Sequence, residues 1–182
     1  MPRLYGKTIM LREYRKEDLP HIREWVTDPE VVDNLSDVFL YPNTLNETEN
    51  FLNRMLEGTT DMRGFIIADR QSEEYIGQLD LIKIDWKNRV AELGVVIGAA
   101  ENRNRGIGTE AIKLLQDFVF NRLNLNRLQL DVHEYNERAI ACYRKCGFQE
   151  EGRRRLNFFI NGRYTDTLIM GILKSEMSPD LP

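Results

Sequence analysis

The spacing of apolar and polar positions predicts a chain in which strands and amphipathic helices alternate. Short apolar or strictly alternating runs, bounded by turn residues, are typical of strands. Such runs occupy residues 8–14, 64–69, 75–84, 89–98, 127–133 and 156–173. The last run contains Asn161-Gly162, a dipeptide that favours a two-residue turn, so we expect it to fold into a β-hairpin.

Four other segments have the three- to four-residue apolar spacing of an amphipathic helix. They are residues 19–26, 45–57, 108–122 and 137–145. Thr44 with Glu47 predicts a capping box at the start of the second helix, and Asn136 predicts the N-cap of the fourth. Gly58 and Gly147 mark the C-terminal ends of these two helices.

The resulting order of elements is β-α-α-β-β-β-α-β-α-β-β. It predicts an α/β (α+β) fold, in which a single mixed, mostly antiparallel sheet has helices on both faces. With 182 residues the chain is long enough for one such domain. We place the domain at residues 7–175 and a C-terminal tail at residues 176–182.

Composition and charge exclude several classes of protein. The formal net charge is −4 and the arginines form short clusters without a continuous basic stripe, so we expect no nucleic acid partner. No apolar run is long enough to cross a bilayer and the N-terminus lacks a signal-peptide apolar region, so we expect no membrane association and a cytoplasmic location. Cys142 and Cys146 do not have the spacing of zinc ligand pairs, so we expect buried thiols and no metal.

The segment Arg103-Asn104-Arg105-Gly106-Ile107-Gly108 joins the strand at 89–98 to the helix at 108–122. The N-terminus of a helix leaves backbone N–H groups unpaired and attracts anions, and glycines let a ligand approach the backbone closely. The segment lacks the Gly-Lys-Ser/Thr ending of a P-loop and the Gly-x-Gly-x-x-Gly pattern of dinucleotide-binding folds. The residues alone leave two interpretations open, an anion-binding loop or a tight turn with solvated arginines.

The same segment resembles the R/Q-x-x-G-x-G/A pyrophosphate loop of the GNAT family of acetyl-CoA-dependent N-acetyltransferases. The downstream stretch "DVHEYNERAIACYRKCGFQEEG" resembles the next strand, helix and strand of that family. The stretch "FFINGRYTDT" resembles the terminal hairpin of its ribosomal-protein-alanine and spermidine acetyltransferases. The resemblance extends over residues 7–175 in organisation. It implies the GNAT acyl-CoA N-acyltransferase fold, acetyl-CoA as cosubstrate, and a homo-oligomer, either a dimer or larger.

The resemblance also implies which residues bind the cosubstrate. The pyrophosphate would lie on the loop and the start of the helix, at Arg103, Asn104, Arg105, Gly106, Ile107, Gly108 and Thr109. The pantetheine arm would pair with the backbone of Val95, Val96 and Ile97 and with Asn136, and the thioester would lie near Tyr143. Gly94, in the same strand, is a candidate site for a β-bulge.

Two residues are candidates for proton transfer. The resemblance makes Tyr143 the general acid that protonates the leaving thiolate, because a phenol stays protonated at neutral pH. Glu92 is the candidate base, since a carboxylate inside the apolar run "VAELGVVI" is unexpected and burial would raise its pKa. Alternatively Glu92 ends a strand at an open cleft or pairs with an arginine. The proton could also leave through water, with Asp80 or Glu134 contributing.

The sequence does not decide between two classes of amine acceptor. The acidic balance and the similarity to spermidine acetyltransferases favour a polyamine, whereas the terminal hairpin also resembles enzymes that modify a protein N-terminus. In both cases we expect the N-terminal helices and the last hairpin to form the acceptor pocket. A different class, a non-catalytic acetyl-CoA sensor or interaction domain, is disfavoured because neither Tyr143 nor the glycine loop is missing.

Overall fold

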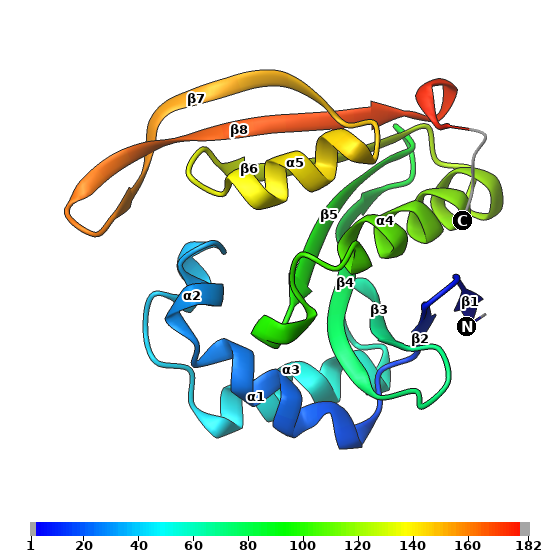
Figure 1. Cartoon of the computed structure of the whole chain (residues 1–182), viewed down its shortest axis with the longest axis vertical. Coiled ribbons are helices and arrows are strands. Elements are labelled where there is room, and N and C mark those ends of the chain that lie inside the picture. Colours follow the sequence, from blue (N-terminus) through cyan, green and yellow to red (C-terminus); the bar gives the residue numbers. More distant parts are fainter. Residues whose placement is uncertain (1–2, 179–182) are drawn as a thin grey trace.

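The computed structural model describes residues 3–178 and contains an eight-stranded sheet in the order β1-β2-β3-β4-β5-β6-β8-β7 (Figure 1). Every neighbouring pair is antiparallel except β5–β6, which is parallel. The strands are β1 (Leu4–Tyr5), β2 (Ile9–Arg12), β3 (Arg63–Asp69), β4 (Tyr75–Asp85), β5 (Val90–Ile97), β6 (Arg127–His133), β7 (Gln149–Ile160) and β8 (Arg163–Leu173). The predicted α/β fold with one mixed, mostly antiparallel sheet is confirmed.

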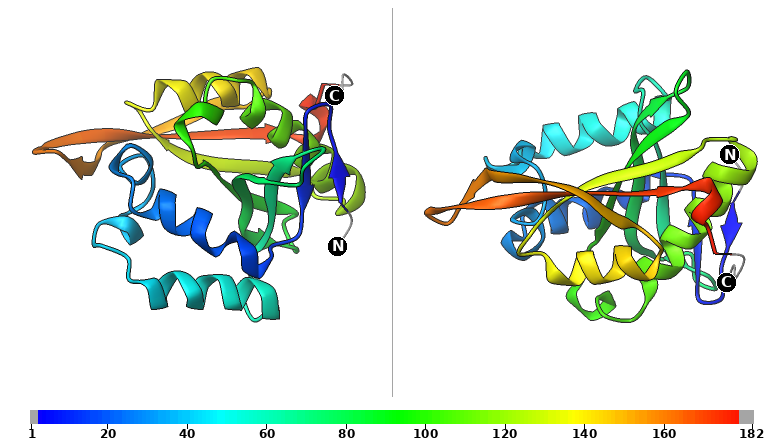
Figure 2. Two further views of the ribbon diagram at one scale, coloured as in Figure 1. Left: turned by 60° about the horizontal axis from the view of Figure 1, so that its bottom comes forward. Right: turned by 90° about the horizontal axis from the view of Figure 1, so that it is seen from above.

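The helices lie on both faces of this sheet (Figure 2). They are α1 (Leu19–Val26), α2 (Pro29–Val32), α3 (Leu45–Glu57), α4 (Ile107–Asp117) and α5 (Glu137–Lys145). The helix expected at 108–122 ends as an α-helix at Asp117 and continues as a π-helical turn over Phe118–Arg122. Strand β1 and helix α2 were not predicted, because elements of two and four residues are too short to show a periodic pattern.

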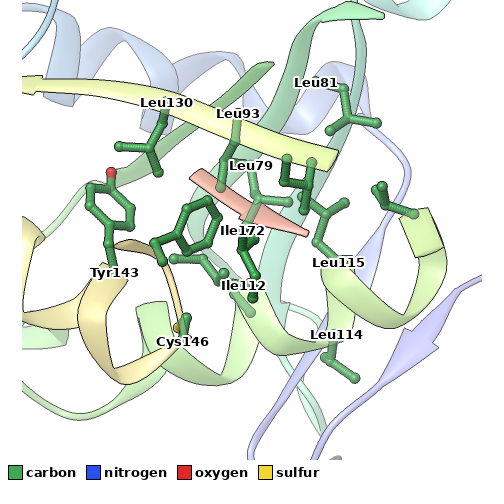
Figure 3. Close-up of a cluster of buried hydrophobic side chains, with 14 of the residues drawn as sticks. Leu79, Leu81, Leu93, Ile112, Leu114, Leu115, Leu130, Tyr143, Cys146 and Ile172 are labelled. Atoms are coloured by element: carbon green, nitrogen blue, oxygen red, sulfur yellow. The ribbon is translucent and has the colours of Figure 1, made fainter. Parts of the chain in front are cut away.

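Two apolar clusters, one on each face, hold the helices to the sheet. Helices α4 and α5 cover a cluster that includes Leu79, Leu93, Ile112, Leu115 and Ile172, all at most 4% exposed (Figure 3). On the opposite face α1 and α3 pack against β2 and β3. That second cluster includes Met10, Ile22, Trp25, Leu52 and Ile66. The sheet is therefore buried on both sides, as the long apolar strands predict.

The predicted caps and turns are present in the structure. Thr44 Oγ1 accepts a hydrogen bond from Glu47 N at 3.2 Å, and Glu47 Oε2 accepts one from Thr44 N at 2.6 Å. Asn136 caps α5, since its Oδ1 accepts from Ala139 N. The hairpin turns at Asn161 and Gly162, whose φ angles of 50° and 79° are those of a type I′ turn.

One outer edge of the sheet is β7, which is interrupted twice in its pairing with β8. The register shifts between Glu150 and Gly152, and again between Arg154 and Phe158. Together with β8, this strand forms a long hairpin whose tip projects beyond the helices (Figure 1). At the end of β8, Lys174–Glu176 forms a 3-10 turn, while the predicted tail residues 179–182 lie outside the described chain.

The sheet opens between β5 and β6, and this opening positions the site. Only three residue pairs join the two strands, and the last of them is Glu92 with Gln129. Beyond that pair β5 is bonded only to β4, while β6 follows β8 away from it (Figure 1). Residues 93–97 therefore leave one edge of β5 free of sheet pairing, and unpaired edges are ready to accept an extended ligand.

The expectation of a bulge at Gly94 is wrong. Gly94 pairs regularly with Asp80, and the extra residue is Ile82 on the neighbouring strand β4. A Cβ on Gly94 would lie 2.8 Å from Cδ1 of Ile82, so the glycine provides the space into which the bulged side chain fits. Among residues 3–178, no helix is both long and apolar enough to cross a membrane.

Candidate active site

Helix α4 begins at the glycine loop without a side-chain cap. Its N-cap residue is Gly106, which has a φ of 76°, and a Cβ there would have no heavy atom within 4 Å. Helices α3 and α5, by contrast, begin with the side-chain caps Thr44 and Asn136. The first N–H groups of α4 are therefore left for an acceptor from outside the chain, as an anion site at a helix N-terminus requires.

Gly108 and Thr109 hold the start of α4 against α5. A Cβ on Gly108 would lie 3.4 Å from Cys142 Sγ, and Thr109 Oγ1 lies 3.4 Å from the same sulfur atom. Cys142 is half-buried and Cys146 is buried, so the expectation of two buried thiols holds fully only for Cys146. Within the described residues, no group of three or more potential ligands is arranged to hold a metal.

The two arginines of the loop have different environments. Arg105 is exposed, and its side chain has no hydrogen bond or ion pair within residues 3–178. Arg103 is turned toward α2, where its Nη2 donates to Gly98 O at 2.9 Å and pairs with Asp28 at 3.3 Å, while its Nη1 pairs with Glu30 at 3.3 Å. The side chain of Arg103 is thus engaged by the protein, whereas that of Arg105 is available to a ligand.

Tyr143 lies on the inner face of α5, at the rim of the apolar cluster. It is 8% exposed and packs against Phe148, with ring centroids 5.9 Å apart. Its hydroxyl group points past Leu130 of β6 and has no hydrogen-bond partner in the described chain (Figure 3). Burial raises the pKa of Tyr143 well above its ordinary value, so the phenol stays protonated and able to donate.

Glu92 lies at the last residue pair before β5 and β6 separate. Its neighbours Ala91 and Leu93 point into the apolar cluster under α4, so Glu92 faces the opposite side of the sheet. The side chain is half-buried, and no hydrogen bond or ion pair joins it to another residue between 3 and 178. Glu92 therefore has no arginine partner in the described chain and lies where β5 loses β6 as a neighbour.

Asp80 is the buried carboxylate of the site. It is 6% exposed, pairs with Gly94 of β5, and accepts hydrogen bonds from Tyr14 Oη at 2.6 Å and Gln78 Nε2 at 3.0 Å. Burial raises its pKa to about 6, although the two hydrogen bonds oppose the shift. Asp80 therefore changes protonation state close to neutral pH, as a proton acceptor should.

The hydrogen bonds of Asp80 belong to a longer polar network under α1. Trp25 Nε1 donates to Tyr75 Oη at 3.0 Å, and Tyr75 Oη lies 3.4 Å from the Gln78 oxygen. Sequence analysis missed this network except for Asp80. The available signal was the pair Gln78 and Asp80, two polar residues on the same face of an otherwise apolar strand.

Several other predicted residues have defined positions. Val95 and Ile97 pack toward α4, and Val96 packs toward α1, all on the part of β5 that has lost β6 as a partner. The carboxylate of Glu134 already has two partners in the hairpin. It accepts a hydrogen bond from Asp166 N at 2.9 Å and forms an ion pair with Arg153 at 3.0 Å. It is therefore poorly placed to take a proton from a substrate.

A cavity of about 380 Å³ lies between α2 and the tip of the hairpin. Its walls come from three parts of the chain, namely α2 with the residues after it, Tyr135 beyond the end of β6, and the tip of the hairpin. The lining residues are Pro29, Glu30, Asp33, Asn34, Tyr135, Ile160, Asn161 and Arg163. Two of them are acidic and one is basic, and Tyr135 fixes the wall by donating a hydrogen bond to the carbonyl of Asp33.

The uncapped helix start, the free edge of β5 and the buried tyrosine lie in a region that comparison with known proteins assigns to a family. The family model described as Acetyltransferase (GNAT) domain matches residues 8–149. The chain belongs to this family and is an acetyltransferase.

Individual relatives indicate a branch of the family. The chain is 36% identical over 133 residues to Spermidine N(1)-acetyltransferase of Vibrio cholerae, covering 73% of this chain and 75% of that protein. It is 30% identical over 174 residues to Spermidine N(1)-acetyltransferase of Escherichia coli K12, covering 93% and 88%. A crystal structure of the Vibrio cholerae enzyme in complex with CoA and spermine superimposes with a TM-score of 0.82 and 32% identity, covering 94% and 98%.

Proposed function

We propose that this protein transfers the acetyl group of acetyl-CoA to a primary amine of a polyamine. The observation that carries the proposal is the opening of the sheet between β5 and β6, together with the uncapped helix start of α4 and the cavity lined by Glu30 and Asp33. The relatives named as spermidine acetyltransferases support the choice of acceptor.

The residues present fit the phosphate part of acetyl-CoA. The N–H groups at the start of α4 lack a side-chain cap, Gly106 leaves the approach open, and Arg105 brings an unpaired positive charge. The pantetheine arm would extend along Val95, Val96 and Ile97, where the backbone edge is free of sheet pairing, and reach Asn136. Acetyl-CoA supplies an activated thioester, which the amine attacks directly.

The acceptor must lose a proton before it attacks. A polyamine nitrogen resembles lysine, with a pKa of about 10.4, so neutralising it at pH 7 costs about 4–5 kcal/mol. Glu92 lies at the mouth of the opening with no competing cation, and we assign it as the base. Asp80, whose pKa is raised to about 6, would accept the proton through water on the same face of the sheet.

The leaving thiolate must gain a proton. Tyr143 has a free hydroxyl group and a raised pKa, so it remains a proton donor throughout the neutral range. Its ring is fixed by the packing of α5, which limits the motion of the hydroxyl group. We propose that Tyr143 donates this proton.

The proposal is tested by measuring release of the CoA thiol from acetyl-CoA. One assay contains spermidine and a parallel assay contains a peptide that begins with the alanine of a ribosomal protein. Turnover with spermidine and not with the peptide is the expected result. Turnover with the peptide alone would overturn the polyamine assignment, and turnover with neither amine would also overturn it and indicate another small amine as the acceptor.

One observation favours the peptide as a second candidate. Phe159 and Tyr164 are 57% and 63% exposed on the hairpin beside the cavity, with ring centroids 4.9 Å apart. Exposed aromatic residues are suited to an unfolded peptide, and an α-amino group with a pKa near 8 needs less help from a base.

We further propose that the enzyme acts in the cytoplasm and forms a homo-oligomer. Size-exclusion chromatography with light scattering would test the oligomeric state.

A further inference from the structure

The side chain of Arg103 connects the two halves of the proposed site. It starts in the glycine loop, is only 7% exposed, and ends between Asp28 and Glu30 beside α2. Glu30 is 79% exposed and also lines the cavity between α2 and the hairpin. One carboxylate therefore serves both as the partner of a loop arginine and as part of the cavity wall.

The hydrogen bonding of Arg103 is incomplete. Its Nη atoms are satisfied by Gly98 O and the two carboxylates, but its Nε is buried and has no partner in the described chain. A buried donor without an acceptor is unfavourable, and a phosphate oxygen reaching this loop is an acceptor that a guanidinium group binds well. Because the side chain is buried against α2, an anion on the loop could bind Arg103 only if the side chain turned away from Glu30, so the two contacts would compete.

We propose that Arg103 is a positioning residue that couples binding of the two substrates, because it exchanges between Glu30 and the phosphates. This inference rests on the proposed function, with acetyl-CoA at the loop and a cationic amine in the cavity. A cation that pairs with Glu30 weakens the ion pair between Glu30 and Arg103. Arg103 then attracts phosphate more strongly. Conversely, phosphate that binds Arg103 releases Glu30 to pair with the amine. Each substrate therefore raises the affinity for the other by the same factor.

Asp28 keeps the loop and α2 together during this exchange. Its carboxylate accepts from the backbone N–H of Glu30 at 2.9 Å, which caps α2, and it also holds Arg103. The loop therefore stays attached to α2 when Glu30 is occupied by an amine. Because ion pairs with an exposed partner contribute little, we expect a coupling of about two- to fivefold in affinity.

The test is titration calorimetry of CoA, which does not react, with and without saturating spermidine. In the unmodified protein, spermidine should increase the CoA affinity about two- to fivefold. Glu30→Gln should abolish that increase and should also tighten CoA binding in the absence of spermidine, because Arg103 loses a competing carboxylate. A purely structural role for Glu30 would weaken CoA binding or leave it unchanged.

Asp33→Asn is the matched control, since Asp33 lines the same cavity and has no contact with Arg103. At saturating spermidine it should retain the coupling, whereas Arg103→Gln should lose it. If both ligands bind and Glu30→Gln keeps the coupling of the unmodified protein, the inference is overturned and the proposed function stands. Failure of the unmodified protein to bind CoA would overturn both.

Discussion

Tyr143 is a residue whose proposed role depends on a single atom. The ring contributes to the apolar cluster, while the hydroxyl group has no partner in the described chain. Packing and chemistry are therefore separable at this position, because phenylalanine keeps the ring and removes only the proton donor.

We expect Tyr143→Phe to lower kcat by about 10²- to 10⁴-fold, the usual contribution of a positioned general acid. The affinity for CoA and the melting temperature should stay close to those of the unmodified protein, since no hydrogen bond is lost. Calorimetry and thermal unfolding supply these controls. Unchanged turnover would remove Tyr143 as the acid.

Asp80 links the site to the stability of the protein. Its pKa rises from an ordinary value of 3.8 to about 6 in the folded state, because burial disfavours the carboxylate. The folded protein therefore holds this proton more tightly than the unfolded chain does. The contribution to stability is complete below about pH 4 and is lost as the pH rises through 6, by about 3 kcal/mol.

Asp80→Asn should remove this pH dependence. The difference in unfolding free energy between Asp80→Asn and the unmodified protein should shift in favour of the variant, by up to about 3 kcal/mol between pH 4 and pH 7. Denaturant unfolding at several pH values measures it. Taking the difference cancels the acidic groups that the two proteins share, and parallel pH profiles would contradict a raised pKa at Asp80.

At the scale of elements, the main feature of the start of α4 is that no side chain caps it. Gly106 takes a left-handed conformation, faces open space, and provides no side chain to cap the helix. A side-chain cap in place of this glycine would stabilise the helix by roughly a few tenths of a kcal/mol. The absence of a cap is explained if a ligand accepts hydrogen bonds from these N–H groups.

Gly106→Glu should weaken CoA binding by roughly tenfold, because it places a negative charge where the phosphate is expected. Gly106→Gln is the control of nearly equal size, with the same backbone strain and no charge. It should share any loss of thermal stability with Gly106→Glu but bind CoA more tightly. Equal affinities for the two variants would argue against a phosphate site at this helix.

The entry into α1 depends on a buried ion pair. Arg12, at the end of β2, donates two hydrogen bonds to Asp18, at 2.8 and 3.0 Å, and both side chains are 3% exposed. Asp18 also accepts from Arg15 N at 2.7 Å, which forms the 3-10 turn before the helix. The pair thus fixes the direction in which the chain leaves the sheet.

Arg12→Gln should destabilise the protein by about 3–5 kcal/mol, because it leaves a buried carboxylate without its charged partner. Arg15→Gln affects ion pairs with Glu13 and Glu73 that are partly exposed, and it should cost no more than about 1 kcal/mol. Chemical denaturation of both variants compares them directly. Similar losses for the two would show that burial does not distinguish these arginines.

At the scale of the whole molecule, the framework of the fold could be predicted because it is encoded locally. Apolar periodicity located the long helices and the buried strands but only the second part of the exposed strand β7, from residue 156 on. The caps at Thr44 and Asn136 and the turn at Asn161-Gly162 are short-range signals. The opening between β5 and β6 could not be predicted, because it depends on which residues of two distant strands pair. For the same reason the sequence motif included Arg103 but gave no sign that its side chain turns to Glu30.

The interrupted pairing of β7 has a consequence for how the molecule behaves in a crowded solution. An unbroken edge strand is a template on which further chains can aggregate. Here the register is broken at two points, and Arg153 and Arg154 place charges along the edge, paired with Asp166 and Asp131. The edge strand β7 thus differs from the part of β5 that has no β6 partner. Residues 93–97 of β5 keep a regular pairing with β4 on their other side, whereas β7 is irregular and charged, which disfavours strand-to-strand pairing at that edge with another copy of the chain.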